Sequence, residues 1–251
     1  MKILVIPDTQ VKEGVDTAHL SWVGQYIVDK KPDVIVHIGD HWDMPSLCSY
    51  DKGKKSFEGK RYTKDIAAGN EGMKTLLAPV KAEQARLVSN KKRRYNPRLI
   101  FCTGNHEERI MRAVNNDAML EGMMGYQDLY LDDWEVYDYL ETVTVEGVVF
   151  SHFFTSGVMG RPVTSARALL TKKHQSCVMG HVQSRDIAYA RRADGTSLTG
   201  LFVGICYTHE EDYLGAQGNS DWRGVWMLND VNDGSFDEMP ISIKYLENKY
   251  G

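Results

Sequence analysis

The sequence predicts an α/β (α+β) fold in which two mixed β-sheets pack as a sandwich flanked by helices. Short, nearly continuous apolar runs recur along the chain, as is typical of strands that are buried on both faces. Helical patterns separate some of these runs in the earlier part of the chain, whereas the later part follows antiparallel hairpin signals. This order of elements fits two packed sheets with helices outside them.

The expected strands of the earlier part are five apolar runs. They are Ile3–Ile6, Val34–Gly39, Leu99–Gly104, Val148–Phe150 and Cys177–Gly180. Each is short enough for a strand, and a polar side chain follows each of them within a few residues.

Three segments are expected to be helical. Apolar residues form a helical stripe within Asp16–Lys31, and a looser pattern runs through Asn70–Lys92. Pro79 is expected to mark a break or a helix start in the second segment, because proline lacks the amide hydrogen of a helix interior. Thr164-Ser165 can cap a further helix that continues through Leu170.

The later part of the chain is expected to be antiparallel. Ala188–Arg192 and Ser197–Cys206 predict a hairpin that turns at residues 193–195. Gly224–Leu228 and Ile241–Leu246 predict two further strands, joined through an Asn-Asp-Gly turn at residues 232–234.

The overall composition limits the class of protein. A chain of 251 residues predicts a single domain over residues 1–251, with a possible small insertion at 44–95. The net charge of −4 gives no general attraction to nucleic acid or anionic membranes. We expect neither a signal peptide nor a membrane partner. The four cysteines form no CxxC pair and predict buried free thiols, which suits a cytoplasmic protein.

The polar residues that follow the strands indicate a metal site. Singly, each has a structural explanation: Asp8 could cap a turn, Asn105 could adopt a left-handed turn, and His152 could be a core histidine. Together they are better explained as ligands, since open α/β sheets form their ligand crevice outside the carboxyl ends of the strands. Carboxylate, amide and imidazole groups are ligands for divalent cations.

Five motifs carry a resemblance to a known family. In chain order they are Asp8-Thr9-Gln10, Gly39-Asp40-His41-Trp42-Asp43, Gly104-Asn105-His106-Glu107, Ser151-His152 and Gly180-His181-Val182-Gln183. With them the chain resembles the calcineurin-like metallophosphoesterases, whose pattern is DxH, GDxxD, GNHE, a lone histidine and GHxH. The resemblance spans residues 8–183, and GDxxD followed by GNHE is its specific part. The chain is also similar to the compact, phage-carried members.

The resemblance implies the two-sheet fold of the family and a site for two divalent metal ions. The implied ligands of the first ion are Asp8, Gln10, Asp40 and Gln183, and those of the second are Asp40, Asn105, His152 and His181. His106 would be the catalytic imidazole that faces the substrate, oriented by Asp43. His41 is expected to contact substrate or to support the site. Arg109 could clamp phosphate or be a solvated helix residue.

These residue types suit phosphoester hydrolysis. Phosphate esters are anionic and repel hydroxide, whereas two cations about 3.5–4 Å apart neutralise the ester and activate a bridging hydroxide. The leaving group then needs a proton, and a histidine titrates in the right range. A carboxylate beside that histidine favours its protonated form.

The chain departs from the family pattern at Gln10 and Gln183, which stand where the family has histidine. Both positions belong to the first ion, whose ligands would then all be oxygen atoms. Oxygen ligands favour Mn²⁺ or Mg²⁺ over Zn²⁺. We expect an intact two-metal enzyme that uses Mn²⁺, with Mg²⁺, Zn²⁺, Fe or Ni²⁺ as alternatives. The competing hypothesis is a weakened first site.

The predicted function is metal-dependent phosphoester hydrolysis, by a phosphatase, phosphodiesterase or nuclease. Tyr50, Phe57 and Tyr62 accompany the lysines and arginines of residues 52–64. A solvated basic loop is the favoured explanation of this stretch. The alternative is contact with phosphates and stacked bases, which slightly favours nucleic acid or a nucleotide over a phosphoprotein as the substrate. The alternative function is a non-catalytic interaction module that binds metal. The presence of His106 and Asp43 favours the enzyme.

Overall fold

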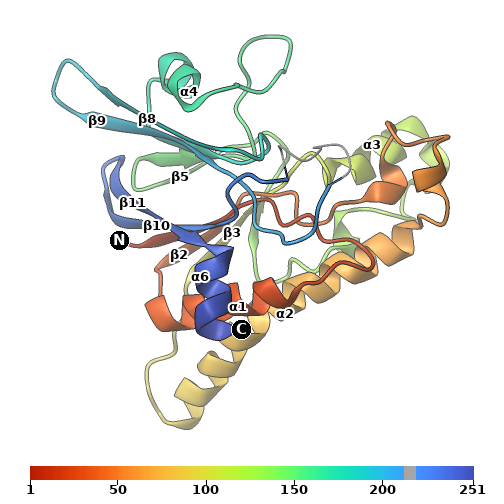
Figure 1. The fold of residues 1–251 in the computed structure, drawn as a ribbon, viewed down its shortest axis with the longest axis horizontal. Coiled ribbons are helices and arrows are strands. Elements are labelled where there is room, and N and C mark those ends of the chain that lie inside the picture. Colours follow the sequence, from red (N-terminus) through yellow and green to blue (C-terminus); the bar gives the residue numbers. More distant parts are fainter. Residues whose placement is uncertain (212–218) are drawn as a thin grey trace.

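The structure, a computed structural model, describes residues 1–211 and 219–251 and has four layers. Two β-sheets pack face to face, with helices on the outer face of each (Figure 1). The helices are α1 (Ala18–Lys30), α2 (Tyr62–Ser89), α3 (Glu108–Asn116), α4 (Ala166–Lys173) and α6 (Ile243–Tyr250). Short 3₁₀ turns occupy Pro45–Leu47, Lys55–Phe57, Ala118–Leu120 and Tyr126–Asp128.

Both sheets are mixed, which confirms the predicted fold class. The six-stranded sheet has the order β11-β10-β1-β2-β3-β4. Its strands are β1 (Ile3–Ile6), β2 (Val34–His37), β3 (Arg98–Cys102), β4 (Glu135–Tyr137), β10 (Gly224–Asn232) and β11 (Ser235–Ser242). The five-stranded sheet has the order β5-β6-β7-β9-β8. Its strands are β5 (Val143–Val145), β6 (Val148–Phe150), β7 (Cys177–Met179), β8 (Arg185–Arg191) and β9 (Ser197–Val203).

Strand β1 shows why the apolar runs are continuous. Ile3 and Val5 pack into the core between the two sheets, whereas Leu4 and Ile6 pack into the core under the helices. Successive side chains of a strand point to opposite faces, so a strand that is covered on both sides has no polar position.

The parallel strands bring their carboxyl ends to one edge. β1, β2 and β3 are parallel neighbours, and β6 and β7 are parallel neighbours in the second sheet. The sheets are joined at this edge, where the Cys206 N–H donates to the Asp8 carbonyl oxygen at 2.8 Å. Gly180 permits the close approach, because a Cβ there would lie only 2.4 Å from Asp8 Oδ1.

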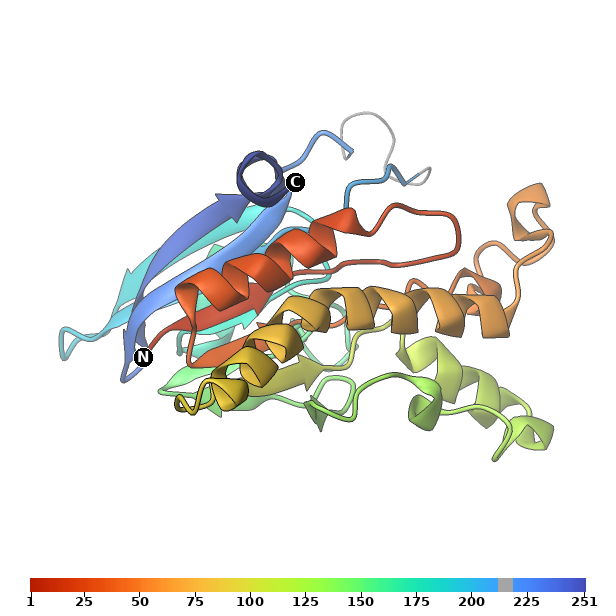
Figure 2. The same cartoon turned by 90° about the horizontal axis from the view of Figure 1, so that it is seen from below.

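Helix α2 differs from the expectation at Pro79, which lies inside one continuous helix (Figure 2). Packing against α1 explains this. Gly24 of α1 comes so close that a Cβ there would lie 2.9 Å from the Pro79 ring and 2.4 Å from the Leu76 carbonyl oxygen. The buried contact between the two helices outweighs the cost of about 3 kcal/mol for an interior proline.

The expectation of a strand over Ile241–Leu246 was partly wrong. Strand β11 begins earlier, at Ser235, and ends at Ser242, after which the chain is helical. The Ser242 hydroxyl accepts a hydrogen bond from the Tyr245 N–H at 3.2 Å and so caps α6. Ile243 and Leu246 are buried three positions apart, a spacing that suits one face of a helix.

Other expectations of local structure are confirmed. The Ser165 hydroxyl accepts from the Ala168 N–H at 3.2 Å and caps α4. The hairpin of β8 and β9 turns at residues 192–196. All four cysteines are free and buried.

Among the described residues, no helix has the length and apolar character needed to cross a membrane. The insertion at 44–95 in a single domain stays a prediction.

One histidine of α1 makes stability depend on pH. His19 is buried, and burial lowers its pKa from 6.5 to about 4. The folded state therefore holds it neutral, so its contribution is complete above pH 6.5 and is lost as pH falls toward 4. We expect the wild type to lose about 3 kcal/mol more unfolding free energy than His19→Leu between pH 7 and pH 4. Denaturant unfolding of both proteins at the two pH values tests this, and equal losses would contradict it.

Candidate metal centre

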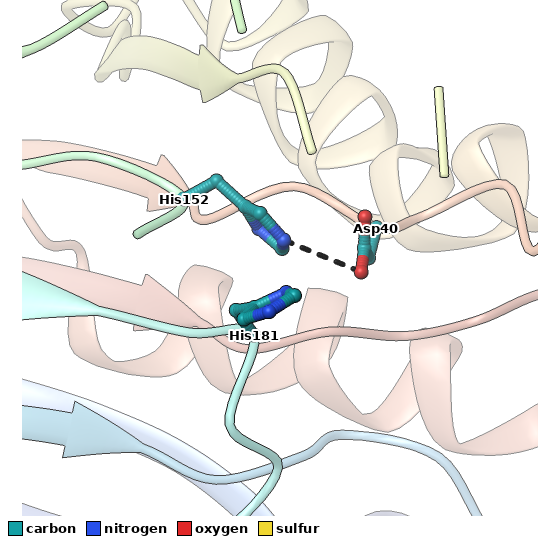
Figure 3. Close-up of side chains that lie close together, drawn as sticks. All are labelled: Asp40, His152 and His181. Carbon is teal, nitrogen blue, oxygen red and sulfur yellow. Dashed lines mark ion pairs between the residues drawn. The ribbon is translucent and has the colours of Figure 1, made fainter. Parts of the chain in front are cut away.

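Most of the residues predicted to bind metal come together at the carboxyl edge of the two sheets. Asp40 follows β2, whereas His152 and His181 follow β6 and β7. One potential ligand atom from each of these three residues lies within 4.8 Å of the other two. Figure 3 shows the two imidazoles and the carboxylate pointing toward one another. Asp40 and His152 are buried and His181 is half-buried, so a polar cluster with one open side is formed.

Asn105 completes this cluster from the loop after β3. Its Oδ1 lies 2.9 Å from His152 Nε2 and 2.6 Å from His181 Nδ1. His152 Nε2 also lies 3.3 Å from Asp40 Oδ2. Ligand atoms about 2.1 Å from a common cation would be separated by about 3.0–3.4 Å. The two spacings at His152 are close to this range, whereas the 2.6 Å between Asn105 and His181 is a hydrogen-bond distance that would have to widen around an ion.

The protonation of His152 strengthens this interpretation. Its Nδ1 lies 2.8 Å from the Ile38 carbonyl oxygen, which can only accept, so Nδ1 carries a proton and donates it. In a neutral imidazole, Nε2 then presents a lone pair to the oxygens of Asp40 and Asn105, which are acceptors too. Such a set of buried lone pairs needs a cation or a proton among them. Burial alone would lower the pKa of His152, but Asp40 and Asp8 raise it to about 9.

Asp8 extends the cluster from the end of β1. Its Oδ1 accepts from the His181 N–H at 3.3 Å. Its Oδ2 is buried and has no hydrogen bond with the described residues. Burial and the nearby Asp40 carboxylate raise the pKa of Asp8 to about 7. A second cation beside Asp8 and Asp40 would therefore balance the negative charge of the two carboxylates.

Backbone strain gathers at the same positions. Gln10, Asp40, His181 and Gln183 all have positive φ, at 39°, 50°, 65° and 62°. Residues with a side chain rarely adopt this region, at a cost on the order of 1 kcal/mol or more each. The Gln10 N–H donates to the Asp40 carbonyl oxygen at 2.9 Å, so the two strained loops support each other. Metal ligation by Gln10 and Gln183 stays a prediction.

His106 lies beside the cluster and is oriented by Asp43. Its Nδ1 lies 2.9 Å from Asp43 Oδ1 and 2.9 Å from the Asp43 carbonyl oxygen, so it donates to Asp43. Its Nε2 lies 3.0 Å from Arg109 Nη2 and 3.7 Å from Asp40 Oδ2. Burial opposes a charged imidazole, but the carboxylates of Asp40 and Asp43 raise the pKa of His106. A guanidinium group can only donate, so Nε2 accepts from Arg109 in this arrangement and can carry a proton only when Arg109 turns to another acceptor.

Glu107 fixes the loops that carry these residues. Its carboxylate is fully buried and accepts from the backbone N–H groups of Asp40, His41, Trp42 and Gly104 at 2.7–3.0 Å. Glu107 belongs to the GNHE motif, but no role was predicted for it. Its function depends on N–H groups about sixty-five positions away, which no local pattern shows.

Lys12 and Glu211 were missed entirely. The Lys12 ammonium lies 3.2 Å from Asp43 Oδ2 and also pairs with Glu211. Glu211 in turn lies 2.8 Å from His209 Nε2. Asp43 is therefore held at Oδ1 by His106 and at Oδ2 by Lys12. The sole sequence signal was a lysine two residues after Gln10.

Of the two roles expected for His41, the contacts of its ring agree with support of the site. It is fully buried, donates from Nε2 to the Gly69 carbonyl oxygen at 2.9 Å, and accepts from the Thr9 hydroxyl at 2.7 Å. Both ring nitrogens are thus used inside the protein, where burial lowers the pKa of His41 to about 4. His41 supports the loop after β1 from behind and does not reach substrate.

Comparisons with known proteins agree with this geometry. A family model described as calcineurin-like phosphoesterase matches residues 1–197. The gene 54 protein of Mycobacterium phage D29 is 38% identical over 82 residues, and that of Mycobacterium phage L5 is 42% identical over 64 residues. These matches cover 32% and 26% of this chain, and 30% and 25% of the relatives' own length.

Two solved structures are also similar. Yfce, a phosphoesterase from E. coli, has 13% identity and a TM-score of 0.39, over 97% of this chain and 100% of that chain. A conserved uncharacterised protein from Streptococcus pneumoniae TIGR4, described as a predicted phosphoesterase, has 11% identity and a TM-score of 0.35, over 96% and 97% of the two chains.

The role of Glu107 predicts a combined loss of stability and metal affinity. Glu107→Gln would replace one accepting oxygen by an NH₂ group that faces N–H donors, at a cost of about 2–3 kcal/mol. We expect a lower melting temperature and about tenfold weaker Mn²⁺ binding. Thermal unfolding and calorimetric titration test this, with the exposed Glu121→Gln as the control. Unchanged metal affinity in the Glu107 variant would show that the loops do not depend on this carboxylate.

Proposed function

The chain belongs to the calcineurin-like phosphoesterase family, and from this premise we propose that it is a phosphoester hydrolase with a dinuclear metal centre. The observation that supports this most directly is the convergence of buried lone pairs from Asp40, Asn105 and His152. The raised pKa of His152 lets a proton on its Nε2 satisfy them without metal, and a bound metal ion would take the place of that proton.

The proposed ligands divide between two ions. Asp8, Gln10, Asp40 and Gln183 would hold the first, and Asp40, Asn105, His152 and His181 would hold the second. Asp40 would be shared, because its carboxylate lies 3.3 Å from His152 and interacts electrostatically with Asp8. When bound, the two cations would supply positive charge that neutralises the phosphoryl oxygens and acidifies water. We propose Mn²⁺ as the preferred ion, since the first ligand set contains only oxygen atoms.

The protein side chains handle the proton and the orientation of the substrate. Asp43 holds the imidazole of His106 by its Nδ1, which leaves Nε2 directed toward the cluster. Protonated His106 would donate from Nε2 to the departing oxygen of the ester. Arg109 lies 3.0 Å from this Nε2 and would attract the phosphate with its guanidinium group. Lys12 keeps Asp43 in place from the opposite side.

A variant of His106 separates catalysis from metal binding. Because His106 acts on the proton and not on the metal, His106→Ala should lower turnover of bis-p-nitrophenyl phosphate about 10²–10⁴-fold with Mn²⁺. Mn²⁺ affinity, measured by calorimetry, should stay close to the wild-type value. His174→Asn, at an exposed histidine outside the centre, is the control.

Two other results would change the assignment. Loss of Mn²⁺ binding in His106→Ala would show that His106 is a ligand. If the wild type binds Mn²⁺ but turns over neither bis-p-nitrophenyl phosphate nor p-nitrophenyl phosphate, the non-catalytic interaction module becomes the better explanation.

A further prediction concerns Gln10 and Gln183. The double variant Gln10→His and Gln183→His would give the first ion two imidazole ligands, which suit Zn²⁺. We expect the affinity ratio of Zn²⁺ to Mn²⁺ to rise about tenfold or more. Competitive metal titration with elemental analysis measures this, and Gln127→His, at an exposed glutamine, is the control. An unchanged ratio with unchanged occupancy would show that the glutamines do not select the metal.

A further inference from the structure

A cleft of about 550 Å³ opens onto the metal centre and is not explained by hydrolysis of a simple ester. Asn105 and His181 form part of its wall, so the cleft is continuous with the candidate metal site. The other walls come from residues 46–57, from one face of α3, and from residues 153–162. A substrate that reacts at the centre would extend into this space.

The lining of the cleft is strongly cationic. It contains Lys52, Arg109, Arg112 and Arg161, and no aspartate or glutamate among the described residues. The chain as a whole has 34 acidic and 30 basic residues, so a lining of this composition departs from its overall balance. A concave surface with charges of one sign concentrates ligands of the opposite sign.

Three of these cations have no protein partner in the part of the chain that the structure describes. The side chains of Lys52, Arg112 and Arg161 form no hydrogen bond or ion pair with the described residues. Cations elsewhere are commonly paired with carboxylates, as Lys31 is with Glu83 and Arg98 with Glu135. These three side chains therefore carry positive charge into the cleft without an ion pair to any described carboxylate.

Helix α3 arranges two of the cations in a line. Arg109 contacts His106, which the proposed function places beside the reacting phosphate, and also donates to the Asp43 carbonyl oxygen. Arg112 lies three residues further on the same helix face, about 4.5 Å along the axis, and both line the cleft. Arg161 faces the cleft from the segment after β6. Positive charge thus continues from the centre into the cleft, which suits a substrate with a second phosphate.

Aromatic side chains accompany these cations. Tyr50 is 83% exposed and Phe57 is half-buried, and both line the cleft. An exposed aromatic ring beside cations is a platform on which a nucleobase can stack. Phe153 differs, because its ring packs against His181 at 4.6 Å between centroids and supports the centre.

We propose that this cleft binds single-stranded nucleic acid, with the phosphate next to the scissile one held by Arg112 and Arg161 and a base stacked on Tyr50. The proposal rests on the proposed phosphoesterase function and specifies its substrate class. A phosphopeptide carries no regular second phosphate and gives no reason for this row of cations. A nucleotide shares the chemistry of one nucleic acid unit, so the experiment must distinguish the two by length.

The kinetic test compares substrates that add one unit at a time. Hydrolysis with Mn²⁺ is measured for bis-p-nitrophenyl phosphate, for TpT, for TpTpT and for a thymidine octamer. We expect kcat/KM to rise about tenfold from TpT to TpTpT, because the second phosphate enters the cationic part of the cleft. A mononucleotide site would instead give the three thymidine substrates equal values per phosphodiester bond, which would overturn the proposal.

The matched variants are Arg112→Gln with Arg161→Gln, and Arg93→Gln with Arg191→Gln. The second pair removes the same charge from exposed arginines outside the cleft lining. The cleft pair should lower kcat/KM for the octamer about tenfold more than for bis-p-nitrophenyl phosphate. The log–log slope of its salt dependence should become shallower by about 0.7 for each phosphate that an arginine no longer neutralises. An equal decrease for both substrates, or the same effect in the control pair, would contradict the proposal.

A binding measurement separates this proposal from the proposed hydrolysis. Fluorescence anisotropy of a labelled thymidine octamer needs no turnover. If bis-p-nitrophenyl phosphate is not hydrolysed but the octamer binds and the cleft pair weakens binding about tenfold, the cleft proposal stands while the hydrolase proposal fails. If bis-p-nitrophenyl phosphate is hydrolysed but the octamer neither binds nor reacts, the cleft proposal fails alone. Preferred hydrolysis of a phosphopeptide over the octamer would also overturn it.

Discussion

The candidate site depends on one buried carboxylate that joins two loops. Glu107 accepts four backbone N–H groups, three from residues 40–42 and one from Gly104. Burial and Asp40 raise the pKa of Glu107, and the four donors oppose that rise by stabilising the charged form. The same loops carry Asp40, Asp43, Asn105 and His106. Their relative positions are thus set by a residue that needs no contact with substrate. Gly104 is required as well, since a Cβ there would lie 2.1 Å from Asp40 Oδ1.

The arrangement of the candidate site lowers the stability of the folded protein. Four candidate ligand positions hold left-handed backbone, and the carboxylate of Asp8 keeps one buried oxygen without a hydrogen bond to the described residues. Each feature costs on the order of 1 kcal/mol or more. Proteins retain such costs where the surroundings enforce them, and here the joined sheets do so. Cations that bind the folded state would return part of this energy, because binding to the native state alone stabilises it.

The sequence predicted those parts of the candidate site that follow from the order of strands and motifs along the chain. Asp8, Asp40, Asn105, His152 and His181 each follow a predicted strand, and parallel strands bring such residues to one edge. Features that depend on tertiary packing were missed. Pro79 remains inside α2 because Gly24 of α1 accommodates it, and Lys12 meets Glu211 across 199 positions of sequence. The choice between the two roles of His41 could not be made from its motif, because a motif gives proximity in sequence but not the direction of a side chain. Its two nitrogens are taken by Thr9 and Gly69.

The two sheets contribute different halves of the centre, and this couples the site to the whole fold. Asp8, Asp40 and Asn105 follow strands of the first sheet, whereas His152 and His181 follow strands of the second. Several contacts hold the halves together at this edge. Among them, His152 donates to the Ile38 carbonyl oxygen, and the Cys206 N–H donates to that of Asp8. Neither sheet alone offers a complete set of ligands. Any opening of the sandwich would separate carboxylate from imidazole, so metal binding and sheet packing must favour the same state. The apolar core between the sheets is therefore part of the physical support of the candidate metal site, although it supplies none of the proposed ligands.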